Sequence, residues 1–178
     1  MDITDILKCK RISIMGPSGS GKSTLALKLG EILGLPVHHI DCYFWKPDWE
    51  QTDKQVLKQQ IAAVAKEDWW IIEGGYSSTL EDRFSCAELV LFLDFDIEFC
   101  LRSVKERRAQ GQKIGLPDYL TETDNGFEEL LVYINRYPEH KHKYYLPIIK
   151  RYPDKVIKLN NRAEADGFVS KLKRFAAL

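Results

Sequence analysis

The feature that most constrains the fold is a short apolar run, a glycine-rich loop and an amphipathic segment in direct succession. Residues 16–23, Gly-Pro-Ser-Gly-Ser-Gly-Lys-Ser, match the G-x-x-x-x-G-K-S/T phosphate-binding loop, or P-loop, at every constrained position. The apolar run 11–15 predicts a buried strand, and residues 24–33 carry apolar side chains at helical spacing. A strand, this loop and a helix are the context in which the motif binds phosphate, so the sequence predicts an α/β domain.

The spacing of the loop suits a nucleoside triphosphate. Glycines let successive backbone N–H groups turn toward an anion, and the following helix presents its positive end. Lys22 can reach the β- and γ-phosphates, and the Ser23 hydroxyl can ligate Mg²⁺. A glycine-rich turn without a ligand is the alternative, and the flanking strand and helix argue against it. We therefore expect ATP and Mg²⁺ as cofactors. The predicted nucleotide-binding residues of the loop are Gly16, Pro17, Ser18, Gly19, Ser20, Gly21, Lys22, Ser23 and Thr24.

Composition excludes several classes of protein. The 178 residues suit a single domain over residues 1–178. Lysine plus arginine equals aspartate plus glutamate at 26 each, whereas a dedicated nucleic-acid binder usually has a basic excess, so DNA is not a supported partner, although a local basic patch stays open. The sequence contains no signal-peptide pattern, no apolar run of membrane-spanning length and no C-x-x-C pair. We expect a cytoplasmic protein with reduced thiols and no membrane partner.

Strand-like and helix-like segments alternate, which predicts a three-layer α/β/α fold with a largely parallel sheet. The predicted strands are 11–15, 37–40, 69–72, 89–93 and 155–159. Thr52 is the predicted N-cap of one helix, with Gln55 completing a capping box, and Asp96 is the predicted N-cap of another. The glycine-containing stretch 109–125 lacks periodicity, and we expect a lid over about residues 108–126.

Three acidic residues follow predicted strands, at the edge where open parallel sheets bind ligands. Glu73 resembles the acidic position that holds Mg²⁺ through water or orients an attacking hydroxyl; the alternative is a helix cap. Asp41 could accept the acceptor's proton, hold the acceptor or join the Mg²⁺ shell; the alternative is a turn residue. Asp94 is interpreted as a cap or turn former; the alternative is an indirect partner of the metal.

Basic side chains could neutralise the charge that develops on a transferring phosphoryl group. Arg107 and Arg108 lie at the base of the predicted lid, with a solvated helix face as the alternative. Arg162 could stack on the adenine base, or simply belong to a turn. Arg83 is a further candidate for holding the acceptor. The adjacent histidines 38 and 39 are interpreted as structural, because neighbours on a strand point to opposite faces.

Several segments together carry a family resemblance. They are residues 16–23, 35–41 (Leu-Pro-Val-His-His-Ile-Asp), 45–49 (Trp-Lys-Pro-Asp-Trp), 70–76 (Trp-Ile-Ile-Glu-Gly-Gly-Tyr) and 93–95 (Leu-Asp-Phe). In these segments the chain resembles the bacterial "DNA topology modulation protein" family, which is similar to adenylate and shikimate kinases among the P-loop kinases. The resemblance runs from about Arg11 to the last helix. The P-loop is shared by very many proteins; Asp41 followed by the tryptophan pair, together with the glycine-tyrosine segment 74–76, is more specific.

The resemblance implies a five-stranded parallel sheet in the order 2-3-1-4-5, ATP as phosphoryl donor and a closing lid. It also implies an acceptor-binding region at about residues 41–66 and 74–86. The chain departs from the family in two places: it has Glu-Gly-Gly at 73–75 where the family has Asp-Gly-Asn, and Leu-Pro-Asp at 116–118 where the family has Arg-Pro-Asp. The second departure leaves Arg107 and Arg108 to stabilise the transition state.

Three hypotheses on function follow. The first is a kinase that moves the γ-phosphoryl group of Mg·ATP to a small acceptor, with a nucleoside monophosphate as one candidate. Its catalytic residues would be Lys22, Asp41, Glu73, Arg107 and Arg108, with Ser23 and Glu73 around the metal. The alternative is a nucleotide-dependent regulatory or DNA-topology-associated module with little kinase activity. A plain NTPase, with water as acceptor, is the third.

Overall fold

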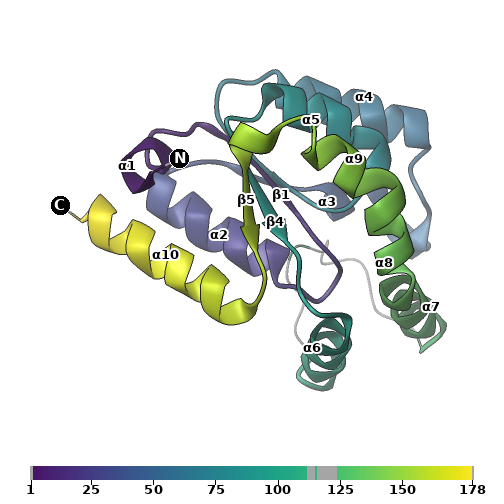
Figure 1. The fold of residues 1–178 in the computed structure, drawn as a ribbon. Helices are drawn as coiled ribbons and strands as arrows, with labels where there is room; N and C mark the ends of the chain where they lie inside the picture. The colour runs from purple at the N-terminus through teal and green to yellow at the C-terminus, as the bar shows by residue number, and fades with distance from the viewer. Residues whose placement is uncertain (1, 112–114, 116–123, 178) are drawn as a thin grey trace.

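The computed structural model describes residues 2–111, 115 and 124–177, and its strands form one parallel sheet (Figure 1). The strands are β1 (Arg11–Met15), β2 (Val37–His39), β3 (Trp70–Glu73), β4 (Leu89–Leu93) and β5 (Val156–Leu159). Their order is β2-β3-β1-β4-β5, and every neighbouring pair is parallel. The predicted fold class and strand order are therefore confirmed.

Helices cover both faces of the sheet, so the molecule has three layers (Figure 1). One face carries α1, α2 and α10, and the other carries α4, α5 and α9. The α-helices are α1 (Ile3–Ile6), α2 (Lys22–Leu33), α3 (Ile40–Phe44), α4 (Lys54–Ala65), α5 (Leu80–Cys86), α6 (Ile97–Ala109), α7 (Asp124–Asn135), α8 (Tyr137–His140), α9 (Leu146–Ile149) and α10 (Arg162–Ala176). A π-helical turn at 141–145 joins α8 to α9.

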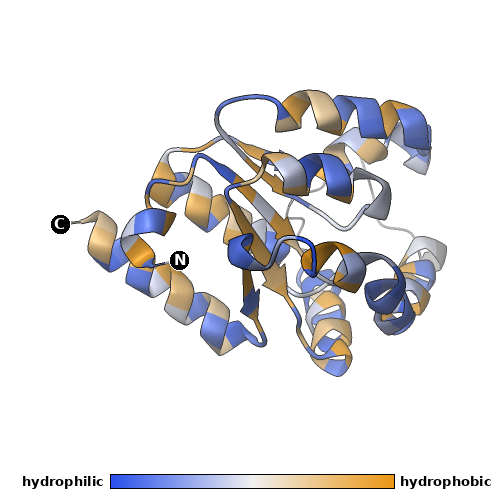
Figure 2. Ribbon diagram, turned by 45° about the horizontal axis from the view of Figure 1, so that its top comes forward, coloured by the Kyte–Doolittle hydropathy of each residue, from blue (hydrophilic) through white to orange (hydrophobic). Residues whose placement is uncertain are grey.

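The core consists of two apolar clusters, one on each face of the sheet. Along β4, Leu91 belongs to the cluster under α2 and α10, whereas Val90 and Phe92 belong to the cluster under α4 and α5. All residues of β4 are buried, as expected for a central strand with helices on both sides. Figure 2 shows largely apolar strands at the centre, between helices in which apolar and polar residues alternate.

Some predicted boundaries and one predicted cap are wrong. The second strand ends at His39, and Ile40 already begins α3. The N-cap of α4 is Asp53, whose carboxylate accepts hydrogen bonds from two backbone N–H groups of the first turn. The Thr52 hydroxyl instead donates to the carbonyl of Tyr43 at 2.8 Å. Thr52, which the local sequence favours as the cap, therefore uses its side chain for a contact outside the helix. Asp96 caps α6 as predicted, accepting from the Phe99 N–H.

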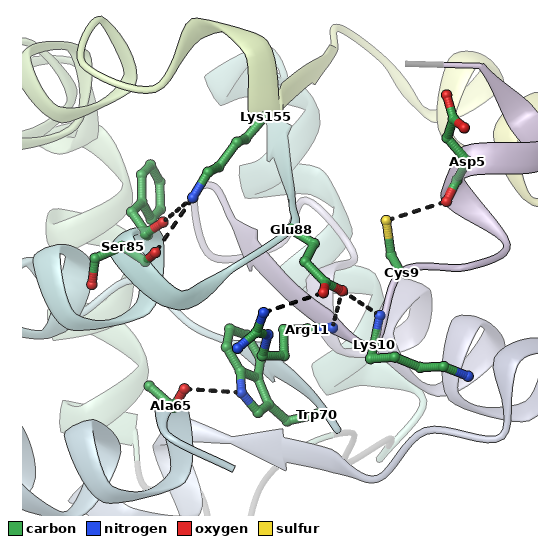
Figure 3. A network of polar contacts seen from close by, with 10 residues as sticks. Asp5, Cys9, Lys10, Arg11, Ala65, Trp70, Ser85, Glu88 and Lys155 are labelled. Atoms are coloured by element: carbon green, nitrogen blue, oxygen red, sulfur yellow. Dashed lines mark hydrogen bonds and ion pairs between the residues drawn. The ribbon is translucent and has the colours of Figure 1, made fainter. Parts of the chain in front are cut away.

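The amino end of the sheet is tied together by polar side chains (Figure 3). The Glu88 carboxylate accepts from the backbone N–H of Lys10 at 2.6 Å and of Arg11 at 3.2 Å. The Arg11 guanidinium also donates to Glu88, at 3.2 Å. The buried indole of Trp70 donates to the Ala65 carbonyl at 3.2 Å. These bonds fix the start of β1 and its neighbours.

Most of the predicted lid, about residues 108–126, lies outside the described residues, between the end of α6 and the start of α7. Among the residues that the structure describes, no helix combines the length and apolarity needed to cross a membrane.

Candidate active site

The P-loop runs from the end of β1 into α2 and is packed against α6. Gly19 has φ +84°, and a Cβ at this position would lie 2.4 Å from the carbonyl oxygen of Cys100. Only glycine fits both the conformation and the space. Gly21 is the N-cap of α2 and has no side chain to bond the first N–H groups of the helix. These groups therefore remain available to an anion.

The Lys22 ammonium donates to the Pro17 carbonyl at 2.9 Å, so the side chain lies back over the loop. The Ser20 hydroxyl donates to the same carbonyl at 2.8 Å and is buried. The predicted phosphate-binding lysine thus stands over the concave side of the loop. A phosphate bound there would replace a single neutral acceptor with an anionic one, which strengthens the bond.

Glu73 at the end of β3 accepts two hydrogen bonds on one oxygen. Its Oε1 lies 2.9 Å from the Ser23 Oγ and 2.6 Å from the His39 Nδ1. Burial raises the pKa of Glu73, but the His39 hydrogen bond and the Lys22 charge outweigh burial and lower the pKa overall. The hydrogen bonds and the lysine charge therefore favour the ionised carboxylate beside the P-loop serine.

Asp41, in the first turn of α3, lies in a different environment. Its Oδ1 accepts from the Tyr76 hydroxyl at 2.5 Å. Burial and the negative charge of Glu73 raise the pKa of Asp41, although the Tyr76 hydrogen bond opposes the shift. The pKa values of two neighbouring carboxyl groups are thus moved in opposite directions. Such pairs suit different roles in one reaction, one as a fixed anion and one as a proton acceptor.

The segment after β3 is held by Arg83, which is fully buried. Its guanidinium donates to the carbonyls of Gly74 at 3.1 Å and Gly75 at 2.8 Å. Burial lowers the pKa of Arg83 to about 10. Both bonds are structural, so Arg83 supports the loop that precedes Tyr76 rather than reaching into open space.

Next to Asp41 lies a row of aromatic side chains, here called the aromatic wall: Phe44, Trp45, Trp49 and Tyr76. The ring of Phe44 lies 4.9 Å from that of Tyr76 and 4.7 Å from that of Trp45, and Trp45 lies 5.2 Å from Trp49 (centroid distances). Tyr76 has a φ of +40°, which a non-glycine residue adopts only when its surroundings require it. The conformation directs its hydroxyl to Asp41.

The predicted cationic residues differ in how close they lie to the P-loop. Arg162 begins α10 and pairs with Asp166 at 3.0 Å. Its Nη1 would lie 2.9 Å from a Cβ on Gly21, so Arg162 lies directly beside the P-loop. Arg107 and Arg108 occupy the last turn of α6, three and four residues beyond Val104, which lies against Gly19 of the loop, and so about 5 Å further along the helix. The guanidinium of Arg108 stacks on the Phe127 ring at 4.2 Å.

Asp94, after β4, is an ion-pair partner and not a cap. It accepts from Lys141 at 2.9 Å and from Lys158 at 2.7 Å. Burial raises its pKa, but the two lysines lower it overall. Asp94, Tyr137 and Lys141 are among the residues that line a pocket of about 380 Å³ between α6 and α8.

The sequence predicted no functional role for His39, and none for Tyr76 beyond its place in the acceptor-binding region 74–86. The histidine was treated as structural, yet parallel pairing sets His39 opposite Glu73 at the ends of β2 and β3. The predicted strands 37–40 and 69–72 end at isoleucines, whereas the observed strands end at His39 and Glu73, so the pairing depended on boundaries that the sequence did not give. Gly115, within the predicted lid, lies beside Ser23, because a Cβ on Gly115 would be 2.8 Å from the Ser23 Oγ.

The donor set fits a Mg²⁺ ion carried by a nucleotide. The serine hydroxyl of Ser23 and the carboxylate of Glu73 are hard oxygen ligands, 2.9 Å apart. Within the described residues, no group of three or more His, Cys, Asp and Glu side chains could hold a metal ion by itself. Magnesium in phosphoryl-transfer sites is bound through one or two protein groups, with phosphates and water supplying the other ligands.

No protein-family model matches the sequence, and none of the curated proteins compared with it is a match. The resemblance to the "DNA topology modulation protein" family therefore stays a prediction. Solved structures are similar over almost the whole chain. A shikimate kinase from Bacteroides thetaiotaomicron has a TM-score of 0.61 and 18% identity, covering 96% of this chain and 99% of its own.

Two further structures agree. A shikimate kinase from Acinetobacter baumannii in complex with shikimate has a TM-score of 0.53 and 15% identity, covering 99% of this chain and 98% of its own. A gluconokinase from Sinorhizobium meliloti 1021 has a TM-score of 0.55 and 15% identity, covering 94% and 95%. At these identities the similarity shows the fold: the chain has the α/β fold of shikimate-kinase-like P-loop structures.

Proposed function

We propose that this protein is an ATP-dependent kinase that transfers the γ-phosphoryl group of Mg·ATP to a small-molecule acceptor. The observation that carries the proposal is that two carboxylates lie beside the P-loop and that their pKa values are shifted in opposite directions. Glu73 bonds Ser23 at 2.9 Å, and Asp41 lies close enough to Glu73 and Lys22 for their charges to affect its pKa. Similarity to shikimate kinases and a gluconokinase supports the reaction class.

The nucleotide would lie along the P-loop. Backbone N–H groups of residues 19–23 and the Lys22 ammonium would bind its phosphates, with Arg162 beside Gly21 bordering the nucleoside. Ser23 and Glu73 would hold Mg²⁺, which when bound neutralises phosphate charge. Arg107 and Arg108, at the base of the predicted lid, are proposed to contribute positive charge as transfer proceeds.

The acceptor would lie near Asp41, against Phe44 and Tyr76 of the aromatic wall. Its hydroxyl oxygen attacks the γ-phosphorus while the bond from that phosphorus to the bridging oxygen of ADP breaks. The hydroxyl proton passes to the Asp41 carboxylate, whose raised pKa suits a proton acceptor. Tyr76 holds that carboxylate in place.

The Glu73→Gln variant tests the assignment. Glutamine keeps the size of the side chain and removes its charge, so we expect the rate to fall far more than the affinity for ATP. Initial rates at saturating ATP, together with calorimetric ATP binding, give both numbers. An equal loss in rate and affinity would indicate a structural carboxylate and contradict the proposal.

A further inference from the structure

We propose that His39 is a positioning residue, which holds the Glu73 carboxylate against Ser23 so that the pair is preformed for a nucleotide-bound Mg²⁺. The inference rests on the proposed function, because it assigns Glu73 and Ser23 to the metal. It goes beyond it by giving a role to a side chain outside the P-loop and the lid. The argument begins from the contact itself.

The contact is short and sheltered. His39 Nδ1 lies 2.6 Å from Glu73 Oε1, and the two side chains expose only 15% and 3% of their surface. A carboxylate can only accept, so Nδ1 carries the proton of this hydrogen bond. The same oxygen accepts from the Ser23 hydroxyl at 2.9 Å. Two donors from different elements therefore converge on one oxygen and fix the carboxylate between them.

The sheet sets this geometry. β2 and β3 are parallel, and His39 is the register partner of Glu73 at the carboxyl end of both strands. The neighbouring His38 faces the other way, where its Nδ1 lies 2.7 Å from the Tyr43 hydroxyl. Strand alternation therefore gives one histidine to the site and keeps the other outside it.

A role as a metal ligand is a poorer fit for His39. Its Nδ1 is already bonded to Glu73, and within the described part of the chain no cluster of three or more ligating side chains surrounds it. Partners of this kind orient a ligating group rather than bind the metal, and their loss costs 10- to 100-fold in metal affinity or activity, by the usual order of magnitude.

The test compares three variants in the full chain. His39→Leu removes the donor, and His39→Asn keeps an amide N–H close to the position of Nδ1. His38→Asn is the matched control on the same strand. The measurement is the calorimetric affinity for a non-hydrolysable ATP analogue with EDTA and with Mg²⁺, and the ratio of the two affinities is the Mg²⁺ enhancement.

We expect His39→Leu to reduce the Mg²⁺ enhancement by about 10-fold or more, without changing the affinity in EDTA. His39→Asn and His38→Asn should keep the wild-type enhancement. Wild-type enhancement in His39→Leu, or an equal loss in His39→Asn, would overturn the proposal. If His39→Leu does not fold, His39→Ala removes the same donor without introducing a new branched side chain.

The double variant His39→Leu/Glu73→Gln sharpens the result. If the histidine acts through the carboxylate, the double variant loses no more enhancement than Glu73→Gln alone. Additive losses would contradict the inference. If the wild-type protein binds no nucleotide in either condition, the proposed function fails instead, and the two failures are thereby distinguished.

Discussion

The two ends of the sheet contain the same kinds of residue, but the surroundings of their carboxylates differ. At the amino end, Glu88 is bonded by the backbone N–H groups of Lys10 and Arg11, in ordinary conformations. At the carboxyl end, the buried Glu73 lies near enough to the half-buried Asp41 for its charge to raise the pKa of Asp41, and Tyr76 has a positive φ. Carboxylates that serve stability are satisfied locally, whereas those that serve a reaction are placed beside like charge and strained backbone.

The comparison predicts that substitutions at the carboxyl end change activity and those at the amino end change stability. The largest effect is expected for Lys22→Ala. Removing the ammonium that is proposed to bind the transferring phosphoryl group should lower kcat by about 10³-fold. The free energy of unfolding should change far less than the rate, because the lysine donates to a loop carbonyl and otherwise acts on Glu73 and Asp41 only through its charge. Lys171→Ala, at an exposed lysine of α10, is the control. Wild-type turnover in Lys22→Ala would refute the assignment.

Asp41→Asn is expected to lower kcat by about 10²-fold, since general-base catalysis contributes about that much. Activity requires the ionised carboxylate, so kcat/KM should rise with pH through the raised pKa of Asp41, above the usual aspartate range. That acid limb should vanish in the variant.

The Tyr76→Phe variant tests whether Asp41 is the group whose titration produces the acid limb. The Tyr76 hydrogen bond favours the ionised form of Asp41, so its removal should move the acid limb to higher pH. The pH dependence of kcat/KM decides the matter, and a limb that stays in place would show that Asp41 is not the titrating group.

Gly19→Ala should affect both properties. The new Cβ would lie 2.4 Å from the Cys100 carbonyl at a φ of +84°, so we expect a loss of about 3 kcal/mol in unfolding free energy, together with weaker ATP binding. Gly34→Ala is the matched control, because φ is +66° and no atom lies within 4 Å. It should cost about 1 kcal/mol, for conformation alone. Equal losses in denaturant titrations would argue against close packing of α6 on the loop.

Glu88→Gln should give the smallest effect, about 1 kcal/mol of stability, because the carboxylate is partly exposed. Burial raises the pKa of Glu88, but hydrogen bonds from Lys10 and Arg11 lower it overall. A lowered pKa stabilises the fold above the usual glutamate range, and this contribution is lost as the pH falls through the folded-state value. The stability difference between wild type and variant should therefore shrink in acid, with kcat unchanged throughout. A loss of kcat would break the comparison between the two ends.

Sequence alone predicted what depends on local pattern. The P-loop motif and the fully apolar run of β4 fixed the fold class, and the convergence of Glu73 with Ser23 follows from strand ends meeting at one edge. Contacts set by register and by distant segments were not accessible. The bond from His39 to Glu73 depends on which face of β2 turns toward β3, and Asp94 pairs with lysines from after the lid region. The α4 cap moved to Asp53 because a loop contact occupied Thr52.

The most direct test of the account is ADP release from Mg·ATP, measured with and without a panel of nucleoside monophosphates and small hydroxyl compounds, with mass-spectrometric detection of product. The account predicts that one acceptor stimulates release and appears as its phosphorylated form, and that Asp41→Asn abolishes the stimulation. Tight ATP binding with slow release that no acceptor changes would contradict it. That result would favour a nucleotide-switched module, for which salt-sensitive retention on DNA is the next measurement.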